Sequence, residues 1–375
     1  MVWSRSDIED IQQELFADDV SWSHDELRYL SRSVIEQFFV SGGVLPPPQP
    51  PPMLPPSISF ASEHGELAAA LLAAGRLGII RITDLPLDAP FAGLQAVFDD
   101  AQASSAAAAP RAYYPKGFAL KDNSGGAVGA DRKRILDLNP KRLAAAQEAL
   151  DGIGPSASAA TDAEDPALEA FRAVVSFWRT TADTVAPKLR AAVARAACCD
   201  AIDGDDHFDF RMVDYFEKEW SSRDEVDDAP PRCRAHRDFG SFTLIYAETA
   251  GLQAQLDAGN ESGVGVQWRD VALPGPRAAL LLYGWCTQIR SNGRLHAVQH
   301  RVLDGPEPQA RAARRTSAVF FVSPSDMQAP LHPVVLDGEA AQYVDGVSAE
   351  AQQMYSMNPL ARAKIAAAAS PAAIS

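Results

Sequence analysis

Three side chains that could bind one metal ion lie in two apolar segments of the second half of the chain. His236 and Asp238 stand two residues apart, just before the run SFTLIY, and His300 lies further on in RLHAVQHRV. In an extended chain, residues i and i+2 point to one face, so the imidazole and the carboxylate can reach one ion. Two histidines and one carboxylate on neighbouring strands suit non-haem Fe(II), with positions left for substrates and O2. By itself His236 is equally consistent with a surface turn.

A second pattern, RTSAVFF, places an arginine and a hydroxyl at the start of an apolar strand. Alternation puts Arg315 and Ser317 on one face of that strand. A guanidinium can hold a carboxylate bidentately, and a hydroxyl two residues on can add a hydrogen bond. The alternative is a solvated basic loop that also includes Arg311 and Arg314. Of these arginines, only Arg315 is in register with Ser317.

The elements that must position these residues follow residue 205, where short apolar runs alternate with turn signals. Such spacing is typical of a β-sandwich or barrel. The runs are FDFRMVDYF, SFTLIYAE, GLQAQLD, VGVQWRDV, AALLLYG, RLHAVQHRVL, TSAVFFVSP and HPVVLD. Before them, the pattern predicts one strand at 77–82 and Ala-rich helices near 63–75, 91–104, 141–151 and 165–197. A last helix is expected near 348–367, so the fold class is α+β.

The chain divides into four predicted segments. Residues 1–56 form a helical extension with a Pro-rich linker, 57–204 a mainly helical region, 205–335 the β core, and 336–375 a C-terminal helix and tail. Two capping-box patterns predict the short helices within 1–43. The stretch LPPPQPPPMLPP is polyproline-like and reads as a stiff spacer, with a ligand for an SH3-like or WW-like protein partner as the alternative.

Charge and cysteine usage exclude several classes of protein. The chain has 34 Lys and Arg against 49 Asp and Glu, a formal charge of −15, with no strong basic block. This argues against binding to nucleic acid or to an anionic membrane surface. No run approaches the roughly 18 apolar residues of a membrane span, and no signal peptide is evident. The four cysteines have no CxxC spacing, so we expect reduced thiols and a cytoplasmic protein.

Taken in order, five segments of the chain resemble one known family. AHRDFGSFTLIY, GLQAQ, VQWRDV, SNGRLHAVQHRV and RRTSAVFF are similar to the isopenicillin N synthase-like Fe(II)/2-oxoglutarate-dependent dioxygenases, and the resemblance covers about residues 205–330. It implies a double-stranded β-helix, or jelly roll, with flanking helices. It also implies that His236, Asp238 and His300 bind Fe(II), and that Arg315 and Ser317 hold the far carboxylate of 2-oxoglutarate.

The resemblance carries further expectations about the site and the activity. Tyr215 stands where the family often places a tyrosine near the co-substrate, although a barrel-wall aromatic is an equal alternative. The implied enzyme uses O2 and 2-oxoglutarate to oxidise, most simply to hydroxylate, a small molecule, and it releases succinate and CO2. The iron does the oxidative chemistry, so no catalytic residue is expected beyond the metal ligands. Val213 and Trp285 depart from the family, which often has Asn and Asp there.

Two other functions and several substrate contacts stay open. The chain could be an oxidase of the same fold that does not use 2-oxoglutarate, or a catalytically inactive jelly-roll binding protein. An anionic substrate group could meet one of three cations, for which solvated surface charge is the alternative: Lys116, Lys121 and Arg211. Tyr113 and Tyr114 are candidates for a lid over the site.

Overall fold

The computed structural model describes residues 51–106, 111–122, 133–153, 165–215, 232–256, 267–303 and 314–352. From Pro52 onward, these residues belong to one compact unit. The helices expected within 1–43 and the first part of the Pro-rich segment lie outside the described residues. The division of the chain into four segments therefore stays a prediction.

A large sheet of eight strands forms the centre of this unit, in the order β1-β2-β10-β7-β12-β5-β4-β3. Only the β1–β2 pair is parallel. The longest pairing joins β5 to β12, in register from Arg315 opposite Tyr215 to Ser323 opposite His207. The strands are β1 Ser57–Ser59, β2 Ile79–Thr83, β3 Lys121–Asp122, β4 Arg134–Leu138, β5 His207–Tyr215, β7 Phe242–Ala247, β10 Ala279–Tyr283 and β12 Arg315–Ser323.

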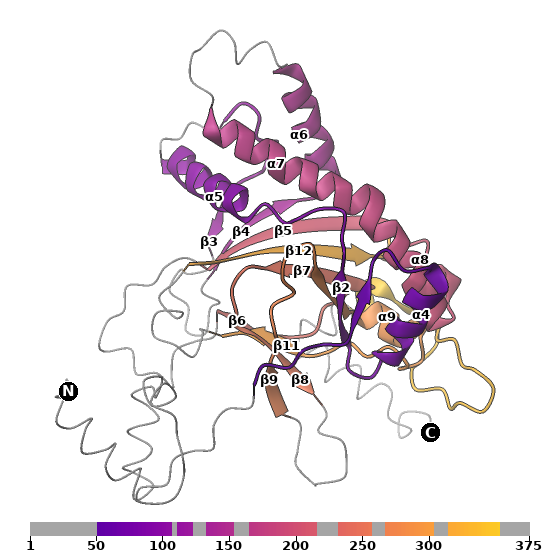
Figure 1. The fold of residues 1–375 in the computed structure, drawn as a ribbon. Coiled ribbons are helices and arrows are strands. Elements are labelled where there is room, and N and C mark those ends of the chain that lie inside the picture. Colours follow the sequence, from indigo (N-terminus) through magenta and orange to yellow (C-terminus); the bar gives the residue numbers. More distant parts are fainter. Residues whose placement is uncertain are drawn as a thin grey trace, which may run out of the picture. The chain divides into compact units, whose positions relative to one another are not determined.

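A smaller sheet in the order β6-β11-β8-β9 faces the large one. Figure 1 shows it on one side of the large sheet, with helices on the other side. Two facing sheets of mainly antiparallel strands form the jelly roll that the sequence predicts. The strands are β6 Cys233–His236, β8 Leu252–Leu256, β9 Gln267–Asp270 and β11 His300–Val302, and a separate pair joins β13 Pro330–Leu331 to β14 Val347–Ser348.

The predicted helices are present and pack on the outer face of the large sheet. They are α4 His64–Ala73, α5 Phe91–Ala106, α6 Pro140–Gly152, α7 Pro166–Thr180 and α8 Ala186–Ala197, with the shorter η2 at Asp200–Ile202. The helix expected over 165–197 is interrupted by a π turn, η1, at Thr181–Val185. Pro187 follows this turn and has no N–H to donate to the carbonyl of residue i−4. The π turn lies where this α-helical hydrogen bond is missing.

The two faces of the large sheet belong to different hydrophobic clusters. On β5, Phe210 and Met212 point toward the helices and join Phe171 and Trp178 there. Val213 and Tyr215 point the other way, into a cluster with Cys233, Leu252, Ala254 and Val302 from the small sheet. The odd-numbered residues of β5 therefore face the space between the sheets. The same holds for β12, where Ala318, Phe320 and Val322 pack against the helices and Val319 faces the small sheet.

The structure corrects several expectations. HPVVLD is not a strand: Val334 donates its N–H to the carbonyl of Arg290 instead, and Pro333 has no N–H for a ladder. RLHAVQHRVL is extended only at His300–Val302. The short strands β1, β3, β4 and β6 were not predicted, and neither was helix α9, Trp285–Arg290, which follows β10. Residues 349–352 begin the expected last helix, and its remainder lies outside the described residues.

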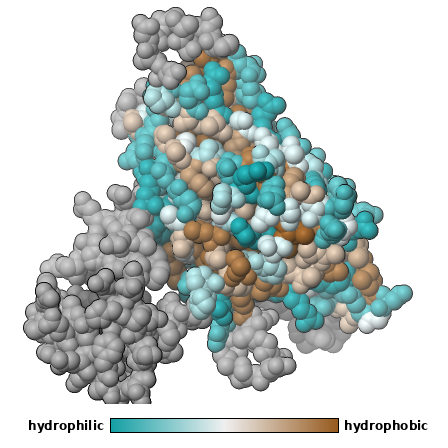
Figure 2. Space-filling model, in the orientation of Figure 1, coloured by the Kyte–Doolittle hydropathy of each residue, from teal (hydrophilic) through white to brown (hydrophobic). Residues whose placement is uncertain are grey.

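None of the described helices is long and apolar enough to cross a membrane. On the face shown in Figure 2, hydrophilic side chains cover much of the helical layer, and hydrophobic ones gather lower on the same face.

A buried ion-pair cluster joins the helices to the large sheet. Asp214 on β5 is fully buried and accepts hydrogen bonds from Nη2 of Arg134 at 2.6 Å and from Nε of Arg314 at 2.9 Å. Arg314 also binds Asp99 on α5 at 3.0 Å. Removing the acid would leave the two guanidinium groups without their shared counter-charge.

We therefore expect Asp214→Asn to lower the free energy of unfolding by about 3 kcal/mol, because breaking one side of a buried pair leaves the other side uncompensated. Urea denaturation of the metal-free protein measures the change. Asp209→Asn removes an exposed carboxylate from the same strand and should cost less than about 0.5 kcal/mol. Equal effects of the two substitutions would contradict the structural role of Asp214.

Candidate metal centre

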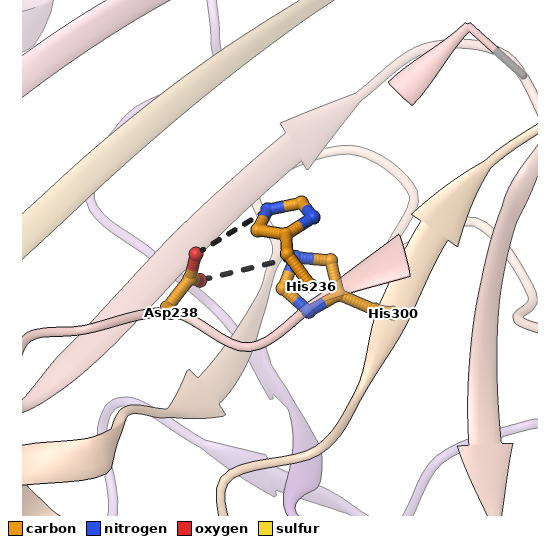
Figure 3. Close-up of side chains that lie close together, drawn as sticks. All are labelled: His236, Asp238 and His300. Atoms are coloured by element: carbon orange, nitrogen blue, oxygen red, sulfur yellow. Dashed lines mark ion pairs between the residues drawn. The ribbon is translucent and has the colours of Figure 1, made fainter. Parts of the chain in front are cut away.

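Two backbone segments bring the predicted metal ligands together between the two sheets (Figure 3). His236 ends strand β6 and lies directly opposite His300 on β11, and Asp238 follows two residues after the strand. His300 is also in register with Ala254 on β8, which belongs to the cluster between the sheets. Paired residues share a face, so the His300 side chain points into this space.

The ligand atoms of the three side chains are close enough to bind one ion. They lie within 4.8 Å of one another. Nε2 of His236 is 3.6 Å from one oxygen of Asp238, and Nε2 of His300 is 3.9 Å from the other. The side chains of Asp238 and His300 are each 6% exposed, whereas that of His236 is 44% exposed. The centre is therefore buried on two sides and open on the side of His236.

The hydrogen bonds around the triad suit a metal. Nδ1 of His236 lies 2.8 Å from the carbonyl oxygen of Arg234, and Nδ1 of His300 lies 3.3 Å from that of Val298. A carbonyl accepts, so each Nδ1 carries a proton and each Nε2 faces Asp238. In the described part of the chain, Oδ2 of Asp238 is buried without a hydrogen bond. A cation at this point would satisfy a carboxylate oxygen that is otherwise costly to bury.

The two histidines differ in their affinity for protons. Burial, together with the positive charge of His236, lowers the pKa of His300 to about 4. Burial also opposes a charge on His236, but the hydrogen bond with Cys233 and the charge of Asp238 outweigh it and raise its pKa to about 9. His300 is therefore neutral and ready to bind a metal at neutral pH, and His236 loses a proton when a metal binds.

Helix α9 holds the loop that carries Asp238. The N–H of Trp285 donates to the carbonyl of Asp238 at 2.9 Å, and that of Cys286 donates to the carbonyl of Phe239 at 3.1 Å. Gly284 precedes the helix and touches Gly240, and a Cβ on Gly284 would overlap the Gly240 carbonyl. Its φ of −101° is ordinary, so the requirement for glycine is one of space alone.

A buried acid anchors the same loop from its other end. Asp205 accepts a hydrogen bond from the Ser241 hydroxyl, and it pairs with Nη1 of Arg290 at 2.6 Å. Burial raises the pKa of Asp205, although Arg290 opposes the shift. Arg290 is the last residue of α9, so a single carboxylate links the helix to the start of β7. The sequence carries no spacing signal for this network, because its members come from three separate segments.

Arg315 and Ser317 form a second buried polar site in the same space between the sheets. Arg315 is 3% exposed, its Nη1 donates to the Ser317 hydroxyl at 2.7 Å, and its Nε lies 3.1 Å from the carbonyl of Ala250. Its guanidinium lies over the ring of Tyr215, 5.0 Å from the centroid. The structure thus brings the three predicted co-substrate residues together, and their roles stay predictions.

Further positive charge surrounds this site, which the sequence did not reveal. Arg232 is buried beside Tyr215, with Nη1 3.4 Å from its carbonyl oxygen. Burial lowers the pKa of Arg315, and the charge of Arg232 lowers it further. Lys133, just before β4, donates to the sulfur of Cys233 at 3.0 Å. Cations gathered in a buried space favour an anionic ligand.

Residues 212–324 match the family described as the 2OG-Fe(II) oxygenase superfamily. These residues, less than a third of the chain, are similar to that superfamily. The match contains Asp238, both histidines and the Arg315–Ser317 pair, which agrees with the resemblance seen in the sequence.

Two individual relatives each match 30% of the chain. The 2-oxoglutarate-Fe(II) type oxidoreductase ppzD of Metarhizium majus is 28% identical over 116 residues, 30% of this chain and 32% of that protein. The 2-oxoglutarate-dependent dioxygenase ecdG of Aspergillus rugulosus is 28% identical over 114 residues, 30% of each chain. These matches span about a third of the length of each relative.

A solved structure extends the likeness to most of the fold. The rice dioxygenase for auxin oxidation superposes with a TM-score of 0.54 at 20% identity, over 84% of this chain and 95% of that one. At this identity the superposition shows the fold, and it confirms the jelly roll with flanking helices.

Other candidate residues lie elsewhere than expected. Tyr113 and Tyr114 pack on Phe171 beneath the helices, on the far face of the large sheet, so the lid hypothesis was wrong. Arg314 was expected in a solvated loop, and it instead pairs with buried Asp214. Arg311 lies outside the described residues. Lys116 is exposed, as solvated charge would be.

The packing of Gly284 against Gly240 leads to a prediction about metal affinity. Gly284→Ala should push the Asp238 loop away from the histidines and weaken Zn(II) binding about 10- to 100-fold, the usual effect of disturbing groups that support metal ligands. Isothermal titration calorimetry measures the affinity. Gly65→Ala adds the same methyl group on α4, where nothing lies within 4 Å of the new Cβ, and should leave it unchanged. Wild-type affinity in Gly284→Ala would show that the loop does not depend on this contact.

Proposed function

We propose that the chain is an Fe(II)- and 2-oxoglutarate-dependent oxygenase that oxidises, most simply hydroxylates, a small-molecule substrate. The observation that carries the proposal is the placement of two sites in one space between the sheets. A His-Asp-His centre fit for a metal lies on the small-sheet side, and a buried arginine with a hydroxyl lies on the large sheet. A metal centre and a carboxylate site on facing sheets are what a chelating dicarboxylate requires.

Each residue has a definite task in this function. His236, Asp238 and His300 would hold Fe(II) on one face and leave the opposite face for ligands. Arg315 and Ser317 would bind the far carboxylate of 2-oxoglutarate, and Tyr215 would keep the guanidinium in place through its ring. With both groups bound, the iron and 2-oxoglutarate supply oxidation of a substrate C–H bond by O2, with release of succinate and CO2.

The surroundings of the enzyme are part of the proposal. We infer a cytoplasmic location from the four cysteines, which are all free thiols. The acidic overall charge supports a small-molecule substrate over nucleic acid or a membrane surface. A protein partner for the Pro-rich segment stays a prediction.

The direct test is anaerobic addition of Fe(II) and 2-oxoglutarate to the purified protein, with a scan for the visible charge-transfer band of an Fe(II)–keto acid chelate. We expect the band in the wild type. Asp238→Ala should abolish it, because a metal ligand is lost. Arg315→Ala should retain it only at 2-oxoglutarate concentrations about 100-fold higher or more, since a buried charge-assisted pair is lost.

The same scan distinguishes the alternatives. Fe(II) binding without the band would favour an oxidase of the same fold that does not use 2-oxoglutarate. No Fe(II) binding at all would remove the metal assignment and leave an inactive jelly-roll binding protein.

A finer prediction concerns the hydroxyl beside Arg315. Ser317→Ala should weaken 2-oxoglutarate binding about three- to tenfold, the range for one lost hydrogen bond, with the band itself unchanged in shape. Titration of the band gives the dissociation constant. Ser323→Ala at the other end of the same strand should bind 2-oxoglutarate like the wild type. A weakening shared by both variants would mean that the strand, and not the hydroxyl, determines affinity.

A further inference from the structure

A second positively charged site lies between the sheets, away from Arg315. Arg211 on β5 binds Asp137 on β4 through Nε at 2.7 Å, and Lys121 on β3 binds the same carboxylate at 2.7 Å. We propose that Arg211 binds an anionic group, most simply a carboxylate, of the prime substrate. The proposal rests on the proposed oxygenase function and names the class of its substrate.

The guanidinium faces the same space as the metal centre. Arg211 alternates with Val213 and Tyr215, which both contact the small sheet, whereas Phe210 and Met212 point toward the helices. Its guanidinium lies over the ring of Phe321 at 5.6 Å, and Phe321 is on the inner face of β12. Asp137 follows the same alternation, because Leu136 and Leu138 belong to the helix-side cluster.

Arg211 and Arg315 are too far apart to share one ligand group. Arg211 is in register with Val319, four residues along β12 from Arg315. At about 3.3 Å per residue, the two positions are about 13 Å apart along the strand. Arg211 also lies toward the end of the sheet where the Asp238 loop joins, since the N–H of Ser241 donates to the carbonyl of Val322 at 2.7 Å. A co-substrate carboxylate on Arg315 therefore leaves Arg211 for a different molecule.

Two cations share one carboxylate at Arg211. Asp137 is the counter-charge for both Lys121 and Arg211, so these three side chains together have a net charge of +1, and Asp209, two residues before Arg211 on β5, is paired with His207. Burial would raise the pKa of Asp137, but the two cations outweigh it and keep the pKa low, so the acid stays charged and orients the guanidinium. The Arg211 side chain is 41% exposed, which leaves it accessible to a ligand.

The chemistry of the site indicates which part of a substrate it takes. An arginine already oriented by one carboxylate offers its remaining N–H groups to a second anion with little further loss of rotamer freedom. The ring of Phe321 and the side chain of Val213 form an apolar wall next to it. The site therefore suits a small organic acid with an apolar body that extends toward the metal.

The test compares an acid with its neutral isostere, phenylacetate and phenylacetamide. The full chain is loaded with Zn(II) in place of Fe(II) and with saturating 2-oxoglutarate, and ligand-observed NMR gives the two affinities. In the wild type, phenylacetate should bind at least about tenfold more tightly than the amide, as expected for a hydrogen-bonded charge. In Arg211→Gln the preference should fall to about twofold or less.

Arg179→Gln is the matched control, because Arg179 is also half-exposed and paired with an acid, but lies on helix α7. This variant should keep the wild-type preference. The proposal is overturned if wild type binds acid and amide equally or binds neither, or if Arg211→Gln keeps the preference. Binding of phenylacetate that appears only when 2-oxoglutarate is left out would also overturn it, because the acid would then occupy the Arg315 site.

Failure of this inference can be told apart from failure of the proposed function. The Fe(II)–2-oxoglutarate band does not involve Arg211, so a normal band in Arg211→Gln shows that the metal and co-substrate sites are intact. A wild type with the band but without the acid preference refutes only the substrate class.

Discussion

The pairing of β6 with β11 is the interaction on which the rest of the site depends. It sets His236 opposite His300 across two short strands. The Asp238 side chain must therefore point toward these two imidazoles. These strands have only four and three residues, so their own hydrogen bonds are few. Their position depends on packing against the large sheet through Cys233 and Val302. The two candidate histidine ligands are thus held by the contact between two sheets more than by either strand alone.

Because side chains alternate along β5 and β12, charged residues that support the fold face the helices, and those proposed to bind ligands face the small sheet. Asp214 and Arg314 point toward the helices, where a buried ion pair joins α5 to the sheet. Arg211 and Arg315, on the same two strands, point into the space between the sheets. Neighbouring residues therefore lie in two environments, one beneath the helices and one between the sheets. A one-residue slip in this register would exchange the two sets and remove both the support and the site.

The sequence predicted which three side chains come together as a candidate metal centre, and most of the β core, because HxD, HRV and RTS each combine a polar group with strand alternation. It could not predict the groups that hold Asp238 in place. Asp205, Ser241 and Arg290 meet only in three dimensions, and the packing of Gly284 on Gly240 leaves no periodic signal. HPVVLD had the composition of a strand, but it does not form one. Pro333 has no N–H to donate, and the N–H of Val334 donates to the carbonyl of Arg290. Tyr113 and Tyr114 failed as a lid because sequence cannot tell which face of a sheet a loop will cover.

The proposed anchoring of a substrate at Arg211 has a consequence for regioselectivity. If a substrate is held by its charged end on one strand, the carbon that meets the reactive centre is determined by its distance from that end. Homologous acids that differ by one methylene would then be oxidised at the same number of bonds from the carboxylate, not at the chemically weakest C–H bond. The distance from the guanidinium to the metal, and not the reactivity of the substrate, would select the product.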